Sequence, residues 1–315
     1  MTAATATLGR RVRVGGISVQ LSRPEKVYFP GDQITKGELV EYYRVVASRM
    51  LPYLRSRPLV LARYPDGITG ERFFQKNIPD YFPAWISRAE VAKQDGVVQH
   101  VIGDKAATLV YLANQGCIEL HVFLSRVGRI DHPDQIVFDL DPPGPGRFGD
   151  VRIAALHLRA LLEGELGLAT FVKSTGGSGL HIHVPLNGRA DFGTARDFTR
   201  QAAALLAARY PDLVTTEQRK ASRGGRIYAD VMRNAYAQTV VAPYSVRARP
   251  GAPVAMPLHW DEVRDSGLEP GRFTLRAAAA RLASGGQGAD PWAGMSRRRY
   301  GLATARRLLG GLAAS

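Results

Sequence analysis

The chain has 315 residues, 45% of them hydrophobic, which allows one large domain or two interlocked halves around a substantial core. Lys and Arg number 42 against 28 Asp and Glu, and the net charge of +14 favours a polyanionic partner, nucleic acid before membrane. The single cysteine excludes an internal disulfide. Because the sequence also shows no signal peptide or long apolar run, we expect a cytosolic protein without a membrane span.

Periodicity and turn residues predict strands alternating with helices. Gly15 and Gly16 separate two alternating runs, as in a hairpin, and Thr35 followed by Glu38 is typical of a capping box. Thr194 is the predicted N-cap of a later helix. The expected elements are a hairpin at 12–21, a helix at 35–54, a strand at 58–64, a helix at 104–116, strands at 117–123 and 135–143, a helix at 150–165, strands from 170 and around 181–184, a helix at 194–210, strands at 227–231 and 243–249, and an Ala/Arg-rich helical tail from about 267.

The strand at residues 135–143 carries the clearest chemical signal. Strand side chains alternate, so Asp139 and Asp141 share one face. Like charges that close repel each other, and a hard divalent cation with oxygen ligands would relieve the repulsion. A solvated strand end that enters a Pro-Pro-Gly turn explains the pair equally plainly when it is taken alone.

Residues 144–149 match the G-x-G-x-x-G pattern between a predicted strand and a helix, as in dinucleotide-binding oxidoreductases. Pro145 removes an amide from a loop whose amides should cradle the pyrophosphate. The two aspartates before the loop would repel that pyrophosphate. A nicotinamide-dependent oxidoreductase is therefore a minor alternative, which a titration with NAD(P)H would test.

A Ser/Thr/Gly-rich turn at residues 173–179 exposes backbone amides that can form an anion-binding nest. The following strand places His181 and His183 on one face. They could belong to a zinc site, but no cysteine or further close histidine completes four ligands. The alternative is a glycine hairpin with two hydrogen-bonded histidines.

A basic glycine loop at residues 220–226 enters a strand in which Asp230 is flanked by apolar residues. A third carboxylate with Asp139 and Asp141 suggests an acidic cluster sized for two cations. Acidic and basic segments alternate in sequence here, as a site for a metal-bound triphosphate requires. Two basic clusters in the tail, at 297–299 and 306–307, could grip phosphate or form a solvated face.

At these residues the chain resembles the polymerase domain of bacterial ligase D and its stand-alone relatives, within the archaeo-eukaryotic primase superfamily. The resemblance runs from about residue 17 to 265 and keeps several motifs in order, which makes it specific. The matching stretches are Glu25-Lys26-Val-Tyr-Phe-Pro30, Arg57-Pro58, Phe73-Phe74, Glu119-Leu-His121-Val, Val137-Phe-Asp-Leu-Asp-Pro, Ser174-Thr-Gly-Gly-Ser-Gly-Leu-His181, Tyr228-Ala-Asp230 with Arg-Asn following, and Ala242-Pro-Tyr-Ser-Val-Arg247.

The resemblance implies an α+β primase-like catalytic domain with a central, mostly antiparallel sheet, flanking helices and an interlocked N-terminal subdomain. We expect this primase-polymerase domain at residues 16–265, after a loose segment at 1–15 and before a helical extension at 266–315. The implied reaction is template-directed nucleotidyl transfer to a 3′-hydroxyl with rNTP preferred over dNTP, in gap filling during end joining or excision repair. The implied partners are gapped or broken DNA with a 5′-phosphate, end-joining proteins such as Ku, and a ligase, in a nucleoid-associated cytoplasmic setting.

The resemblance also implies roles for particular residues. Asp139, Asp141 and Asp230 would hold two Mn²⁺ or Mg²⁺ ions, with Mn²⁺ favoured. The nucleotide-binding residues would be His121, Thr175, Ser178, His181, Lys220, Arg223 and Arg247, with His121 and Thr175 near the sugar. The DNA-binding residues would be Arg23, Lys26 and Lys36, around a 5′-phosphate pocket, and Phe73 and Phe74, which would stack on the template.

Two positions depart from the family pattern. Ser178 replaces a usual lysine, which removes one phosphate contact, and Arg23 replaces an asparagine of the 5′-phosphate pocket. The remaining residues fit no ligase motif or nuclease domain, so we expect a stand-alone polymerase. The alternatives are a non-catalytic scaffold that binds DNA ends, which loss of an aspartate would have favoured, and a primase that starts chains de novo.

Overall fold

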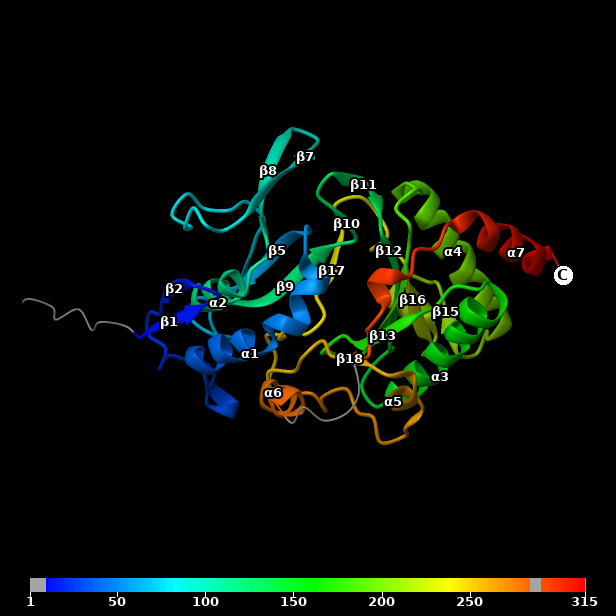
Figure 1. Ribbon diagram of the computed structural model, residues 1–315. Helices are drawn as coiled ribbons and strands as arrows, with labels where there is room; N and C mark the ends of the chain where they lie inside the picture. Colours follow the sequence, from blue (N-terminus) through cyan, green and yellow to red (C-terminus); the bar gives the residue numbers. More distant parts are fainter. Residues whose placement is uncertain (1–9, 284–289, 315) are drawn as a thin grey trace, which may run out of the picture.

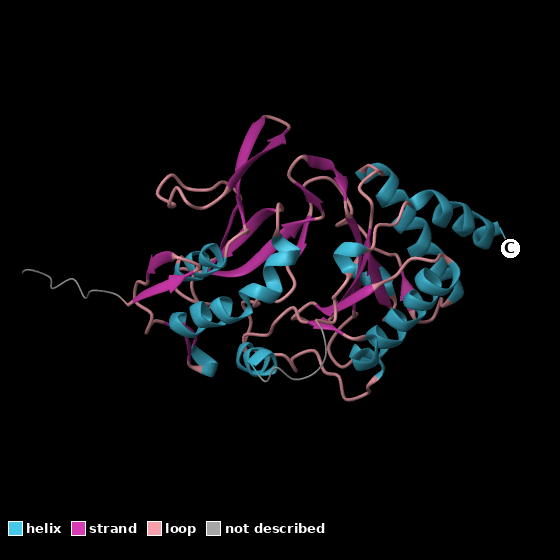
Figure 2. Ribbon diagram, viewed as in Figure 1, coloured by secondary structure: helices cyan, strands magenta, loops and turns pink. Residues whose placement is uncertain are grey.

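The computed structural model describes residues 10–283 and 290–314. Two six-stranded β-sheets lie side by side, with helices packed around both (Figure 1). Figure 2 shows the same view by secondary structure, with most helices in the half of the molecule that contains the C-terminus. This mixed architecture confirms the predicted α+β class and its large antiparallel sheet.

The first sheet contains the aspartate strand at its centre. Every strand pair in it is antiparallel except β15 with β16. In the order in which they pair, its strands are β15 (Val214–Thr215), β16 (Ile227–Asp230), β12 (Gln135–Asp141), β14 (Leu180–Pro185), β13 (Phe171–Ser174) and β18 (Pro257–Leu258).

The second sheet forms the other half of the molecule. It confirms the predicted strands at 58–64 and 117–123. Its strands in pairing order are β17 (Thr239–Val241), β9 (Cys117–Phe123), β5 (Pro58–Arg63), β8 (Gly96–Ile102) and β7 (Arg88–Lys93), and β6 (Phe73–Gln75) also pairs with β5. Three two-stranded sheets complete the set: β1 (Arg11–Val14) with β2 (Ile17–Gln20), β3 (Val27–Phe29) with β4 (Ile34–Thr35), and β10 (Ser125–Arg126) with β11 (Arg129–Pro133).

Helices bury the apolar face of β12. Ile136, Phe138 and Leu140 are fully buried, and α3 and α4 both contact this strand. The opposite face is therefore left to Asp139 and Asp141. The helices are α1 (Lys36–Leu54), α2 (Ala106–Asn114), α3 (Phe148–Arg159) with a π-helical turn (Ala160–Glu165), α4 (Phe192–Arg209), α5 (Trp260–Arg264), α6 (Leu275–Ala283) and α7 (Leu302–Ala314).

The C-terminal segment packs on both halves of the protein. Helix α6 contacts α1, and α7 contacts α4. Between them, the buried Trp292 donates its Nε1–H to the carbonyl of Val172, at 2.8 Å. None of the helices in the described ranges is long and apolar enough to cross a bilayer.

Local signals predicted some boundaries well. The 12–21 hairpin is confirmed as β1 and β2. The capping box is confirmed as well, because Thr35 Oγ1 accepts from the Glu38 amide and the Glu38 carboxylate accepts from the Thr35 amide. Both signals depend on residues close together in sequence.

One predicted helix boundary and one predicted strand are wrong. The N-cap of α4 is Asp191 and not Thr194, because the Asp191 carboxylate accepts from the Thr194 amide at 2.7 Å and starts the helix earlier. Residues 243–249 form no strand. Tyr244 there adopts a φ of 66°, and only an isolated bridge joins Val246 to Val254.

Residues 144–149 also lack the setting of a dinucleotide fingerprint. Both neighbours of β12 in the sheet are antiparallel to it. A Rossmann fingerprint needs a parallel βαβ unit at this point. The structure therefore gives no support to the oxidoreductase alternative.

Candidate active site

A row of ionisable residues crosses the first sheet from strand to strand. The register places Asp139 directly opposite Asp230 on β16 and directly opposite His181 on β14. His181 in turn lies opposite Lys173 on β13. Residues directly opposite in antiparallel strands share a face. The sheet therefore brings together an acid pair, a histidine and a lysine from four strands.

Asn234 holds the two acidic strands together. Its side-chain oxygen accepts from the Val137 amide at 2.8 Å, and its nitrogen donates to the Val137 carbonyl at 2.6 Å. The side chain thus continues the β12–β16 ladder past the end of β16. Asp230 is fixed in turn, because its Oδ1 accepts from the Met232 amide at 2.7 Å.

Burial and mutual repulsion perturb the three carboxyl groups. Burial raises the pKa of Asp139 to about 6, and the nearby Lys173 ammonium offsets only part of that rise. Burial, followed by the charges of Asp139 and Asp230, raises the pKa of Asp141 to about 7. Burial also raises the pKa of Asp230. A cation would stabilise the ionised form of all three carboxyl groups.

The buried polar groups beside Asp139 lack partners. Its Oδ2 lies 3.2 Å from His181 Nε2. Its Oδ1, however, and also His181 Nδ1 and Lys173 Nζ, have no hydrogen-bond partner among the described residues. Burial holds the pKa of Lys173 well below its ordinary value, although the charge of Asp139 opposes this shift. Orphaned polar atoms at this depth indicate a site that a ligand completes.

The glycine-rich turn after β13 is held by one hydroxyl. Thr175 Oγ1 accepts from the amides of Gly177 and Gly179, at 3.1 and 3.3 Å. Gly179 packs directly under β12, because a Cβ there would lie 2.5 Å from the Leu140 carbonyl oxygen and 3.4 Å from Asp141 Oδ1. Ser178 is exposed at the tip of the turn. The turn therefore adjoins the end of β12 that carries Asp141.

The second sheet contributes the facing wall. Glu119 and His121 of β9 lie on one face, with 3.1 Å between Glu119 Oε2 and His121 Nε2. Arg247 pairs with Glu119 at 3.2 Å and donates to the Thr175 carbonyl at 2.7 Å, so it joins the two sheets. Although burial opposes it, contact with His121, Arg247 and the Ala248 amide lowers the pKa of Glu119 to about 2.

Two exposed aromatic rings extend this wall. Phe73 and Phe74 on β6 are 40% and 52% exposed, so part of each ring is accessible to a base. The Phe74 ring lies 6.1 Å from that of His121. The guanidinium groups of Arg63 and Arg72 lie over Phe73 and Phe74, respectively. The structure therefore brings His121 and Phe74 together.

The basic loop borders the aspartates from β16. Arg223 lies over the Tyr228 ring at 4.1 Å and donates to the carbonyls of Glu217 and Gln218. Its charge lowers the pKa of Asp141 against the larger effect of burial, so it lies near that carboxylate. Lys220 is exposed. Arg226 instead bonds to the carbonyls of its own loop and of Pro211.

Arg23, Lys26 and Lys36 meet at the start of α1. Lys36 is 4% exposed, and its ammonium donates to Ser22 Oγ at 3.0 Å and to the Asn114 carbonyl at 3.4 Å. Burial, followed by the charge of Arg23, lowers the pKa of Lys36 to about 8. Lys26 donates to the Pro65 carbonyl and pairs with the Asp66 carboxylate. Three cations therefore gather here with two nearby acids, Asp66 and Glu25.

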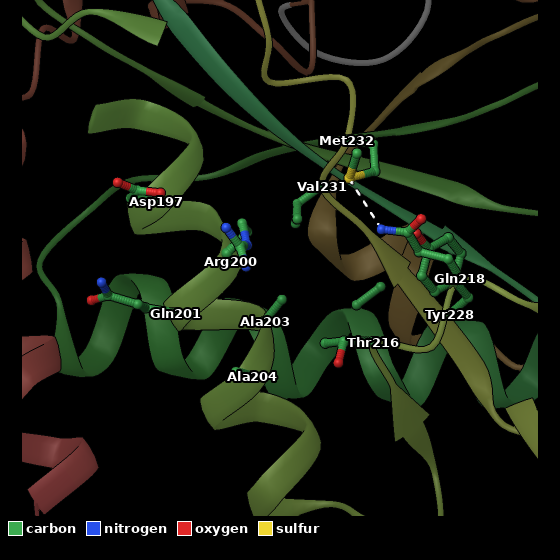
Figure 3. Close-up of a pocket in the computed structure, with 11 residues that line it drawn as sticks. Asp197, Arg200, Gln201, Ala203, Ala204, Thr216, Gln218, Tyr228, Val231 and Met232 are labelled. Atoms are coloured by element: carbon green, nitrogen blue, oxygen red, sulfur yellow. Dashed lines mark hydrogen bonds between the residues drawn. The ribbon is translucent and has the colours of Figure 1, made fainter. Parts of the chain in front are cut away.

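A cavity of about 580 Å³ lies between β16 and α4 (Figure 3). It is lined by Tyr228, Ala229, Val231 and Met232, which flank Asp230 in sequence, and by residues of α4 such as Arg200. Gln218 donates to Met232 Sδ at its edge, at 3.5 Å. None of the three aspartates is among the residues that line this cavity.

Sequence reasoning missed four residues of the candidate site. Glu119 is buried and lies in a stretch that carries the family resemblance, and the buried Lys173 directly precedes another such stretch. Arg233 and Asn234 follow Asp230 in sequence. Arg233 acts on the carboxylates electrostatically, because its charge lowers the pKa of Asp139 against burial. The stretches that carry the family resemblance contained Glu119 and the Arg-Asn pair after Asp230, but neither had been given a role.

The oxygen atoms of the three aspartates are the possible metal ligands of this site. No group of three or more His, Cys, Asp or Glu side chains is arranged to hold a metal ion within residues 10–283 and 290–314. The donors nevertheless suit a hard divalent cation: three oxygen-bearing side chains on adjacent strands, one of them with an orphaned oxygen. The residues fit such an ion chemically, although their side chains are not yet gathered around one.

Comparison with known proteins connects this geometry to a family. The family model described as "LigD, primase-polymerase domain" matches residues 35–292. This chain belongs to the LigD primase-polymerase domain family. The match includes both sheets and all three aspartates, and it extends beyond residue 265, into the segment that contains Trp292.

Relatives and a solved structure agree with the family assignment. The chain is 35% identical over 299 residues to the multifunctional non-homologous end joining protein LigD of Pseudomonas aeruginosa, covering 95% of this chain and 35% of that one. It is 33% identical over 265 residues to the bifunctional LigD of Bacillus subtilis, covering 84% and 42%. It thus spans about a third to two-fifths of these relatives.

The matching structure is the polymerase domain of Mycobacterium tuberculosis ligase D in complex with DNA. The TM-score is 0.80 at 32% sequence identity, and the match covers 84% of this chain and 94% of that chain. Both the fold and the expected family are therefore confirmed.

Proposed function

We propose that this chain is a template-directed nucleotidyltransferase that adds nucleotides to a 3′-hydroxyl at gaps or breaks in DNA. The observation that carries the proposal is the cross-strand cluster of Asp139, Asp141 and Asp230, faced by cationic residues, in a member of this family. The names of its relatives refer to non-homologous end joining. We extend that setting to this chain, with Ku-like end-binding proteins and a ligase as partners.

The acidic cluster would hold two Mn²⁺ or Mg²⁺ ions. Such ions would lower the pKa of the attacking hydroxyl and neutralise the leaving pyrophosphate. The protein's part is to keep Asp139 and Asp230 opposite each other, which the Asn234 bonds support. Because the pKa of Asp141 is raised to about 7 and that of Asp139 to about 6, protons compete with the ions for these groups, and ion binding should strengthen as pH rises above about 7.

The triphosphate would lie between the sheets. Arg223 and Arg247 supply charge from two sides, and their own protein contacts orient them beforehand. His181 would donate a hydrogen bond from beside Asp139, while Lys220 and the exposed Ser178 lie at the edge. Amides of the glycine turn that Thr175 does not occupy would complete an anion-binding nest.

Sugar and template recognition would come from the second sheet. His121 would contact the ribose 2′-hydroxyl, which underlies the proposed preference for rNTP. The Thr175 hydroxyl already accepts two amide bonds, so its main effect would be to shape the turn. Phe73 and Phe74 would stack on template bases, at about 1–3 kcal/mol per base. Arg23, Lys26 and Lys36 would bind the 5′-phosphate downstream of a gap.

Primer extension on a one-nucleotide gap tests the proposal, with rNTPs and dNTPs in Mn²⁺ and with or without the downstream 5′-phosphate. We expect extension that favours rNTPs and is stimulated by the phosphate. Lys26→Ala should remove the stimulation but spare extension of a simple primer-template. Because the contact is ionic, the stimulation should shrink as salt rises. Absence of extension on every substrate would contradict the proposal and favour a binding scaffold.

A further inference from the structure

A second cavity, of about 680 Å³, lies at the ends of β12 and β14 that are remote from Asp141. It is lined by Gln135, where β12 begins, and by His183 and Pro185, where β14 ends. The end of α1, the β10–β11 hairpin and the segment at 292–299 form the other walls. Its volume is typical of sites for small molecules.

The walls of this cavity carry a large excess of positive charge. Asp134 is already shared by Arg57, at 2.7 Å, and Arg126, at 2.6 Å. Asp290 accepts hydrogen bonds from two tyrosines. The other four lining arginines have no carboxylate partner among the described residues; they are Arg55, Arg129, Arg298 and Arg299. Such a cluster of guanidinium groups matches the geometry of phosphate oxygens.

Hydrogen bonds to backbone carbonyls tie together the chain segments that carry or adjoin these exposed arginines. The Arg126 guanidinium donates to the Arg55 carbonyl at 2.6 Å, and the Val127 amide donates to the Ser56 carbonyl at 2.7 Å. On the other side, the Asn187 amide donates to the Tyr300 carbonyl at 2.9 Å. The walls are thus tied to the body of the protein, as a preorganised binding site requires.

A histidine with one unpartnered ring nitrogen lies at the floor of the cavity. His183 is 1% exposed, and its Nδ1 lies 2.9 Å from Gln135 Oε1. Its Nε2 has no hydrogen-bond partner among the described residues. A buried polar nitrogen without a partner is uncommon in folded proteins and indicates a ligand or water that completes it.

We propose that this cavity is a binding site for a phosphate-bearing ligand, separate from the aspartate cluster. The arginines would bind the phosphate oxygens, and the polar floor would receive the rest of the ligand. The same chemistry is offered by a free polyphosphate or nucleotide and by the backbone of an unpaired strand. The proposal does not depend on catalysis at the aspartates.

The sequence offers a matched control. The tail carries two basic clusters, at residues 297–299 and 306–307. Arg298 and Arg299 line the cavity, whereas Arg306 and Arg307 lie on the exposed side of α7. Removing either pair lowers the net charge by the same amount. A difference between the two double variants therefore reports the cavity and not general electrostatics.

The test compares the wild type, Arg298→Ala/Arg299→Ala and Arg306→Ala/Arg307→Ala in EDTA. Binding of pyrophosphate is measured by calorimetry, and binding of a short fluorescent single-stranded DNA by anisotropy. Thermal melting checks folding, and Arg129→Ala serves as a second cavity variant if the double variant is unstable. We expect the cavity variants to weaken one of the probes by at least about tenfold, and the α7 variant to change little.

The two probes identify the source of the phosphate. Weaker pyrophosphate binding in the cavity variants would indicate a free phosphoanion, and weaker DNA binding alone would indicate a strand. Equal effects of the cavity and α7 variants on both probes would overturn the proposal.

Discussion

Asp139 has an acid opposite it on one neighbouring strand and a histidine on the other. The nearest buried cation, Lys173, is one strand further away, so it offsets the charge of Asp139 only in part. At the scale of single residues the site is thus left with unbalanced negative charge. A bound cation is the simplest means of relieving that imbalance.

Position 179 requires glycine because the backbone there approaches β12 closely. A Cβ in Gly179→Ala would meet the rigid Leu140 carbonyl at 2.5 Å, so the turn or the end of β12 must shift. A displacement of about 1 Å near Asp141 should lower extension by about 10²-fold. In Gly177→Ala the new methyl meets a flexible Arg249 side chain at 3.1 Å, so we expect a milder effect in the same assay. Equal activity of both variants would contradict this role.

Ser178 is the position where a family lysine is missing. It is exposed at the tip of the turn, so a longer side chain can be accommodated. Ser178→Lys should lower the KM for rNTP in steady-state extension, because it adds a charge near the proposed triphosphate. An unchanged or higher KM would show that the tip points away from the nucleotide or that another cation already compensates.

Asn234 shows how one side chain can determine the geometry of an element. Asn234→Ala should leave the Val137 amide and carbonyl unpaired, at about 1–3 kcal/mol of unfolding free energy for each group. Because Asp230 would then be less firmly held against Asp139, Mn²⁺ affinity should fall as well. Urea unfolding and calorimetric titration with Mn²⁺ measure the two effects.

Asn234→Asp is the companion variant. It keeps the acceptor for the Val137 amide but loses the bonds from the side-chain nitrogen to the Val137 and Val231 carbonyls. Because a buried carboxylate would then face these two carbonyl oxygens, we expect this variant to be destabilised at least as strongly as Asn234→Ala. Wild-type Mn²⁺ affinity in Asn234→Ala would contradict the proposed positioning role.

Helix α1 begins at a lysine whose burial predicts a pH effect. The pKa of Lys36 falls from 10.5 to about 8, so between these values the unfolded chain binds the proton and the folded chain has released it. Stability therefore rises with pH across this window, relative to a variant without the amine. Lys36→Met keeps the stem and should lose that rise, as measured by urea unfolding on both sides of about pH 8.

The same titration affects end binding. A 5′-phosphate prefers the charged ammonium, so the binding advantage of a phosphorylated gap should shrink as pH rises through about 8. Anisotropy with phosphorylated and unphosphorylated duplexes measures this advantage. A wild-type advantage that does not change with pH would exclude Lys36 from the pocket.

Sequence patterns predicted single helices and strands better than they predicted which distant residues come together in the fold. Asp139 and Asp141 could be placed on one face because strand alternation is local. The pairing of Asp139 with Asp230 depends on the register between strands about ninety residues apart, which no local pattern encodes. The apolar setting of Asp230 suggested an acidic cluster with Asp139 and Asp141, and the family resemblance implied the same grouping. Lys173 was missed as a site residue because a lysine beside a glycine turn normally lies in solvent.

Across the whole molecule, the candidate site lies where the two sheets meet. Arg247 connects them through Glu119 on β9 and the Thr175 carbonyl beyond β13. The proposed sugar and template contacts come from the second sheet, and the acidic cluster comes from the first. Because these two groups of residues come from different sheets, the motifs that carry the family resemblance are spread over most of the chain.

The most direct test of the account measures Mn²⁺ binding and gap extension on the same proteins. They are the wild type, Asp139→Asn, Asp141→Asn and the control Asp131→Asn, which removes an exposed charge on β11. We predict that the two site variants lose Mn²⁺ binding and at least about 100-fold in extension, while the control keeps both. Near wild-type extension by Asp139→Asn or Asp141→Asn would contradict the claim that this cluster performs nucleotidyl transfer.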